Sequence, residues 1–132
     1  MSKDYGGVLN ELVAGRWRHP ISGEIASVDF KSIVMRDGLD GAEPELMASA
    51  GLDRKKLAVV SDRFTYEVLG ERVVRNLKAA GFNIDDVVWQ APVCSDQGVE
   101  QLRSLTAGAE ALVAVGSGTI NDSVKYAAFL DG

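Results

Sequence analysis

Residues 111–122 have the sequence ALVAVGSGTIND, and this stretch decides the fold class. The five residues from Ala111 to Val115 are all apolar, which is typical of a parallel strand covered on both faces. Gly116 and Gly118 interrupt the run, and Ile120 opens a segment whose apolar residues recur at helical spacing. A buried strand that passes through glycines into a helix is the repeating unit of an α/β sheet.

The same alternation extends back to Phe30. Strands are expected at residues 30–35, 57–60, 87–89 and 111–115, and helices at 43–50, 65–80, 99–105 and 120–128. Four alternations predict a Rossmann-like, doubly wound parallel sheet. Such sheets bind ligands at the carboxyl ends of their strands near the topological switch point, so we expect the site after Val60 and Val115. We divide the chain into an N-terminal helix and loop segment, residues 1–30, and a nucleotide-binding domain, residues 31–132.

Composition excludes several classes of protein. No apolar run approaches the roughly 20 residues of a spanning helix, and no secretory signal is visible, so we expect no membrane partner. The net charge of −5 disfavours nucleic acid. Cys94 is the only cysteine, which fits a reducing cytoplasm. His19 is the only histidine, so His and Cys alone provide two residues toward a zinc site.

The glycine turn carries the main chemical prediction. Glycines let a backbone approach a ligand, and the free N–H groups and dipole of the following helix favour an anion such as phosphate or pyrophosphate. The dinucleotide fingerprint Gly-x-Gly-x-x-Gly is incomplete, because Asn121 occupies its sixth position, and no Gly-Lys-Ser/Thr follows. Spacing alone leaves open a tight turn in which the glycines serve sterics only.

Two acids are candidates for binding or catalysis. Asp62 ends the second strand, where a carboxylate can bind both ribose hydroxyls of an adenosine and would repel a 2′-phosphate. A helix cap is the alternative for Asp62, and Arg63 and Thr65 are compatible with either role. Asp122 lies one helical turn past Gly118, where it could meet a substrate hydroxyl or simply interact with the helix dipole.

These pieces resemble a known family. Residues 58–62, AVVSD, followed by Thr65 and a long helix, are similar to the first nucleotide-binding segment of the iron-containing alcohol dehydrogenase and dehydroquinate synthase superfamily. Residues 116–122, GSGTIND, followed by Lys125 and Tyr126, resemble the glycine loop of sn-glycerol-1-phosphate dehydrogenases. Other members more often have three consecutive glycines there. Residues 12–18, LVAGRWR, also resemble the N-terminal segment of bacterial members.

The resemblance implies an NAD- or NADP-dependent, metal-assisted interconversion of dihydroxyacetone phosphate and sn-glycerol 1-phosphate by a homo-oligomer. It implies a catalytic role near substrate and metal for Asp122. The cofactor site that it implies consists of Asp62, Thr65, Gly116, Ser117, Gly118, Thr119 and Asn121. The divalent metal (zinc, iron or nickel) would be bound by an acid and two histidines of a helical C-terminal domain that is absent from residues 1–132. We therefore expect an N-terminal cofactor domain that has no turnover alone.

Three alternatives stay open. Two of them are other members of the superfamily, a glycerol dehydrogenase and a dehydroquinate synthase-like enzyme. From another class comes a stand-alone flavodoxin-like binding module without catalysis. The alternation also predicts a further strand after the last helix, so the flank of Val113 and Val115 is expected to be an exposed edge. We predict that this edge is covered by a second copy or by another chain.

Overall fold

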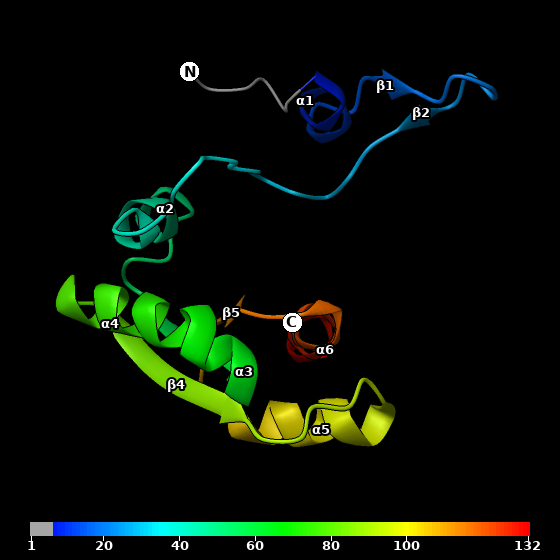
Figure 1. Ribbon diagram of the computed structural model, residues 1–132. Helices are drawn as coiled ribbons and strands as arrows, with labels where there is room; N and C mark the ends of the chain where they lie inside the picture. The colour runs from blue at the N-terminus through cyan, green and yellow to red at the C-terminus, as the bar shows by residue number, and fades with distance from the viewer. Residues whose placement is uncertain (1–6) are drawn as a thin grey trace. The chain divides into compact units, whose positions relative to one another are not determined.

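The computed structural model describes residues 7–132, and the chain divides into two compact units, residues 1–39 and 40–132. In the first unit, helix α1 (Gly7–Val13) precedes a short antiparallel hairpin, whose strands β1 (Trp17–Arg18) and β2 (Ile25–Ala26) have two residues each (Figure 1). The expected turn at Ser22-Gly23 joins these strands, and Gly23 has a φ of 71°. No residue from 7 to 39 is buried. This part of the chain therefore has no core of its own.

The expected strand at Phe30 to Met35 is absent: these residues have no regular secondary structure. Their β-propensity is high, but a strand is stable only when another strand pairs with its backbone. Phe30 and Met35 are each 54% exposed. The prediction of four strands in the sheet is therefore wrong by one.

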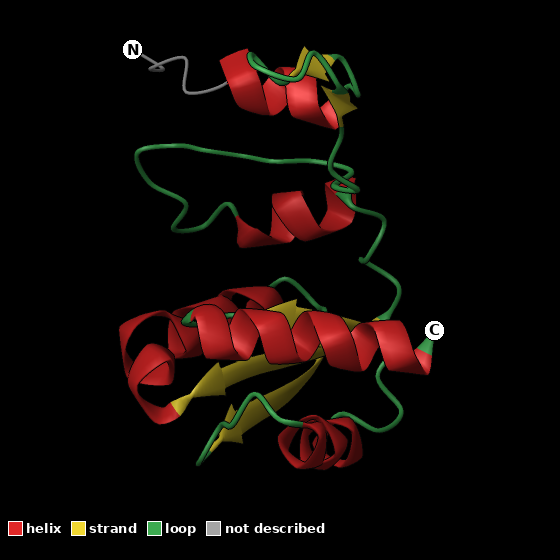
Figure 2. Cartoon of the chain, turned by 90° about the vertical axis from the view of Figure 1, so that its right-hand side faces the viewer, coloured by secondary structure: helices red, strands yellow, loops and turns green. Residues whose placement is uncertain are grey.

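The second unit is an α/β layer structure (Figure 2). Its three parallel strands have the order β4-β3-β5. The strands are β3 (Lys56–Asp62), β4 (Asn83–Trp89) and β5 (Ala111–Ala114), and the helices are α2 (Glu43–Ser49), α3 (Arg63–Thr65), η1 (Tyr66–Gly70), α4 (Glu71–Ala79), α5 (Asp96–Leu105) and α6 (Gly118–Asp131). The chain goes from β3 to β4 on one side and then returns to β5 on the other. This is the doubly wound, Rossmann-like arrangement that the alternation predicts.

Two apolar cores cover the two faces of the sheet. Leu57 and Val59 of β3 face α4, where Leu77 is fully buried, and Met47 of α2 packs against the same cluster. Val60 faces the other way, toward residues of α5 and α6. All four residues from Leu57 to Val60 have no exposed surface, as expected of a strand covered on both faces. Helices on both faces make β3 the centre of the domain.

The helix after β3 differs in detail from the prediction. Thr65 does not begin it: Asp62 is the N-cap, and Thr65 is the third helical residue. The helix then widens into a π turn over Tyr66–Gly70 before α4 begins. A Cβ at Gly70 would lie 3.0 Å from the hydroxyl oxygen of Ser61, so the close approach of helix and strand favours glycine. At the far end Gly81 has a φ of 89°, and it ends the helix as expected.

The outer edge of β5 has no partner strand among residues 7–132, because β5 pairs with β3 alone. All four of its residues are half-buried. The exposed edge is thus present, and the expectation that a second copy or another chain covers it stays a prediction. None of the helices in the described part of the chain is long and apolar enough to cross a membrane.

Candidate functional site

The carboxyl ends of β3 and β5 bring the two expected binding segments together. Val60 and Ala114 are the last paired residues of the two strands, and the Val115 amide donates to the Val60 carbonyl oxygen at 2.8 Å. Asp62 and Gly116 each lie two residues beyond that pair, so they occupy the same end of neighbouring strands. This end is the topological switch point, because the chain goes from β3 to β4 on one side and the next strand, β5, is added on the other side of β3.

The surroundings of the two glycines of the turn differ in whether they leave room for a side chain. A Cβ on Gly116 would lie 2.8 Å from the Cβ of Ile120, whose side chain is fully buried, so packing requires glycine there. A Cβ on Gly118 would meet no atom within 4 Å. Neither glycine has a positive φ. Nothing in the described chain therefore requires glycine at 118, and the open space beside it leaves its backbone accessible to a ligand.

The helices that follow the three strands begin differently. The Asp62 side chain caps α3, and the Ser95 hydroxyl oxygen caps α5 by accepting from the Gly98 amide at 3.1 Å. Ser117 stands at the N-cap of α6, but its side chain makes no capping hydrogen bond. The first N–H groups of an α-helix have no intrahelical partner. The exposed turn at Gly118 therefore presents uncapped donors together with the positive end of the 14-residue α6.

Asp62 and Thr65 form a reciprocal capping box. One oxygen of Asp62, Oδ1, accepts from the Phe64 and Thr65 amides, both at 2.9 Å, and Thr65 Oγ1 accepts from the Asp62 amide at 3.0 Å. The capping alternative for Asp62 is thus realised. The box also holds the carboxylate in one orientation, and Oδ2 takes no part in it. A partly exposed carboxylate with one uncommitted oxygen can still accept from a ribose hydroxyl.

The other expected residues lie on the first turns of α6. Asp122 pairs with Lys125 at 3.1 Å, and both side chains are more than half exposed. The Asn121 amide donates to the Ser117 carbonyl oxygen at 3.0 Å, which is the first intrahelical bond. Ser117 and Asn121 are exposed, and Thr119 is half-buried. The exposed surface of this turn is therefore polar.

Two features near the site were not predicted from the sequence. Phe64 is 69% exposed, and the Arg63 guanidinium lies over its ring, 5.0 Å from the centroid. The hydroxyls of Ser61 and Ser123 are fully buried and have no hydrogen-bond partner among residues 7–132. An arginine followed by a phenylalanine just after the strand was the available signal for the first feature. Burial of a serine within an apolar run depends on packing, so the sequence carries no signal for the second.

A metal does not fit the described residues. Between residues 7 and 132 there is no group of three or more His, Cys, Asp or Glu side chains that could hold an ion. His19 uses Nδ1 to accept from the Ile21 and Ser22 amides, and Cys94 is exposed in a loop. The resemblance places the metal ligands outside residues 1–132, and that expectation stays a prediction. No catalytic step through a metal follows from these residues.

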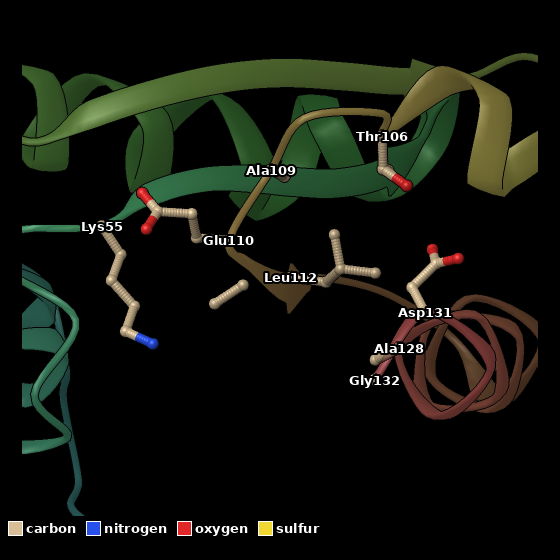
Figure 3. A pocket seen from close by; sticks show the side chains of 9 residues that line it. Lys55, Thr106, Ala109, Glu110, Leu112, Ala128, Asp131 and Gly132 are labelled. Carbon is tan, nitrogen blue, oxygen red and sulfur yellow. The ribbon is translucent and has the colours of Figure 1, made fainter.

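A cavity of about 630 Å³ lies at the opposite end of the sheet (Figure 3). It surrounds Leu112 at the start of β5 and reaches Lys55, Glu110 and, at the end of α6, Asp131. Asp131 is paired with Arg103 at 2.6 Å. Helix C-termini carry partial negative charge, so this end disfavours a phosphate, whatever its volume. By the same electrostatics, the turn at the amino end of α6 favours an anion more than this end does.

A family model described as iron-containing alcohol dehydrogenase matches residues 34–132. The match covers more than half of the 132 residues and includes all three parallel strands. No curated protein matches this chain.

Proposed function

Because this chain belongs to the iron-containing alcohol dehydrogenase family, we propose that the carboxyl end of its sheet binds NAD or NADP for a reaction on a small phosphorylated alcohol. The observation that carries the proposal is the pair of neighbouring strand ends. Asp62 stands at one, and at the other the glycine turn begins an uncapped helix. In chain order the acid precedes the glycines, but in space the two are adjacent, as a dinucleotide requires.

In this proposal each segment has one task. The N–H groups around Gly118 bind the pyrophosphate, and the free space beside Gly118 lets the phosphate oxygens approach the backbone. Asp62 accepts hydrogen bonds from the adenosine ribose through Oδ2, while Oδ1 stays on the α3 amides. Ser117, Thr119 and Asn121 surround the same turn, and Thr65 holds Asp62 in place. When bound, the nicotinamide supplies the hydride acceptor or donor.

The proposed reaction is the interconversion of dihydroxyacetone phosphate and sn-glycerol 1-phosphate. Its support is the form of the glycine turn, in which Ser117 and Asn121 replace residues of the more common triple-glycine loop. Asp122 is the chain's candidate for contact with a substrate hydroxyl, because it is exposed one helical turn from the pyrophosphate donors. A glycerol dehydrogenase and a dehydroquinate synthase-like enzyme are the alternatives within the family.

Calorimetry on the purified chain tests the cofactor proposal. We expect saturable binding of NAD⁺ or NADP⁺ and no binding of FMN. Preferential binding of FMN would instead favour a flavodoxin-like module. Binding is measured rather than turnover because residues 7–132 contain no metal cluster.

Titration of the cofactor-loaded chain with dihydroxyacetone phosphate, glycerol and the dehydroquinate precursor then separates the three substrate classes. Binding of glycerol in preference to dihydroxyacetone phosphate would contradict the proposed substrate.

A further inference from the structure

The residue after Asp62 is a cation whose position is set by an aromatic ring. The Arg63 guanidinium lies 5.0 Å from the centroid of the Phe64 ring. Among the described residues no carboxylate lies within ion-pair distance of Arg63. Phe64 is 69% exposed, so burial in the domain core does not explain its aromatic side chain. The cation–π contact is the interaction that the structure gives to this ring.

The position of Arg63 has a consequence for the choice between the two nicotinamide cofactors, and this reasoning rests on the proposed function. NAD presents a ribose 2′-hydroxyl at the strand end, whereas NADP presents a 2′-phosphate with about two negative charges. The Asp62 carboxylate accepts a hydrogen bond from the hydroxyl and repels the phosphate. Arg63 directly follows Asp62 in the chain, and a guanidinium that turned toward the ribose could neutralise that phosphate. While the guanidinium stays on the Phe64 ring, it does not perform this task.

We propose that Phe64 is a positioning residue that holds Arg63 away from the ribose and thereby makes the site discriminate against a 2′-phosphate. The capping box supports the arrangement, because the Phe64 amide donates to Asp62 Oδ1 at 2.9 Å. The backbone of Phe64 therefore orients the carboxylate that accepts from a ribose hydroxyl. Its ring holds the cation that would otherwise bind a phosphate.

The size of the effect follows from the contact. An exposed cation–π interaction of about 0.5–1 kcal/mol corresponds to about a two- to fivefold change in a dissociation constant. In Phe64→Leu the ring is lost and Arg63 is released. We expect NADP⁺ to bind about two- to fivefold more tightly to this variant, while the dissociation constant of NAD⁺ stays unchanged. Phe64→Trp retains an aromatic face, so this variant should keep the wild-type ratio of the two constants.

Calorimetry with NAD⁺ and NADP⁺ on the whole chain measures these ratios. Arg63→Ala and the double variant Arg63→Ala/Phe64→Leu complete a thermodynamic cycle, in which the effect of Phe64→Leu must disappear when Arg63 is absent. Val68→Leu is the matched control, because Val68 is an 84% exposed apolar residue of the same helix. The Arg63 Nε–H resonance gives an independent readout, since loss of the ring current in Phe64→Leu should shift it.

The outcomes are distinct. A gain for NADP⁺ alone that requires Arg63 supports the proposal. Equal changes for both cofactors, an unchanged ratio, or a gain that persists without Arg63 would overturn it, because Phe64 would then act by another route. If neither cofactor binds to the wild-type chain, the proposed function itself fails. An unshifted Arg63 resonance would show separately that the ring does not hold the guanidinium.

Discussion

Alanine substitutions at the two glycines of the turn should change the stability of the domain in opposite directions. In Gly116→Ala the new Cβ would lie 2.8 Å from the Cβ and 2.9 Å from Cγ1 of Ile120. Ile120 is β-branched and fully buried, so it cannot turn away without disturbing the core. We expect a loss of about 1–3 kcal/mol of unfolding free energy from this overpacking. In Gly118→Ala the new Cβ meets nothing, and the variant should gain about 0.4–1 kcal/mol through the less flexible unfolded chain.

Cofactor binding should follow a different order from stability. If the phosphate approaches the Gly118 backbone, a Cβ there weakens a charge-assisted hydrogen bond worth about 1.5–3 kcal/mol. That loss corresponds to about a ten- to hundredfold rise in the NAD⁺ dissociation constant. Urea denaturation gives the first quantity and calorimetry the second. Gly38→Ala is the matched control, since a Cβ there also meets open space and Gly38 lies outside the site. A Gly118→Ala variant that binds NAD⁺ like the wild type would refute the pyrophosphate assignment.

Three further substitutions test the packing around the site. Burial alone would raise the pKa of Glu43, but hydrogen bonds from the backbone and from Asn76 and Arg72 outweigh it and lower the pKa below the ordinary 4.5. The ionised carboxylate therefore stabilises the fold fully above about pH 4.5 and loses this effect as the pH falls through the lowered folded value. At pH 7, Glu43→Gln should lower the unfolding free energy by about 1 kcal/mol. Urea denaturation at pH 3 should show a smaller difference between this variant and the wild type. An equal difference at both pH values would contradict the direction of the pKa shift. Trp89→Phe replaces a buried indole by a smaller ring and removes its 2.9 Å hydrogen bond to Gln101, so the unfolding free energy should fall by about 1–3 kcal/mol. An unchanged urea midpoint would be inconsistent with that burial. Gly98→Ala would drive a Cβ into the backbone carbonyl oxygen of Val93, and the melting temperature of this variant should fall more than that of either other variant; a wild-type value would exclude this close approach.

The parts of the fold that could be predicted are those whose signal is local. The apolar run at Leu57 to Val60 lies in β3, and the run that ends at Val115 contains β5; their short length, their valines and the glycines after Val115 favour a covered strand over a helix. The prediction fails where tertiary pairing decides. Residues 30–35 have the composition of a strand but no partner strand among the described residues. Glu43 is buried beside Arg72, and because Arg72 lies 29 positions away in the sequence, the local pattern could not predict this burial.

The candidate site could be predicted as a set of residues but not as a geometry. Alternation of strands and helices places Asp62 and Gly116 at strand ends, but only the order β4-β3-β5 makes these ends neighbours. The sequence places the start of this helix at Thr65, whereas the structure starts it after the N-cap Asp62; both residue types favour a cap, and their spacing allows either start. The steric role of Gly116 depends on where Ile120 packs, and that is a property of the folded domain.

The adjacency of Asp62 and Gly116 makes any ligand that touches both a reversible cross-link between distant parts of the chain. Asp62 ends β3 and Gly116 lies in the turn after the neighbouring β5, and all of β4 and α5 lies between them in the sequence. A molecule that bridges them has no binding site in the unfolded polypeptide, so at a hundred times its dissociation constant it adds about 2.7 kcal/mol to the unfolding free energy. The rise in melting temperature with the concentration of a nicotinamide dinucleotide would then measure both the affinity and the packing of β5 and α6 against β3.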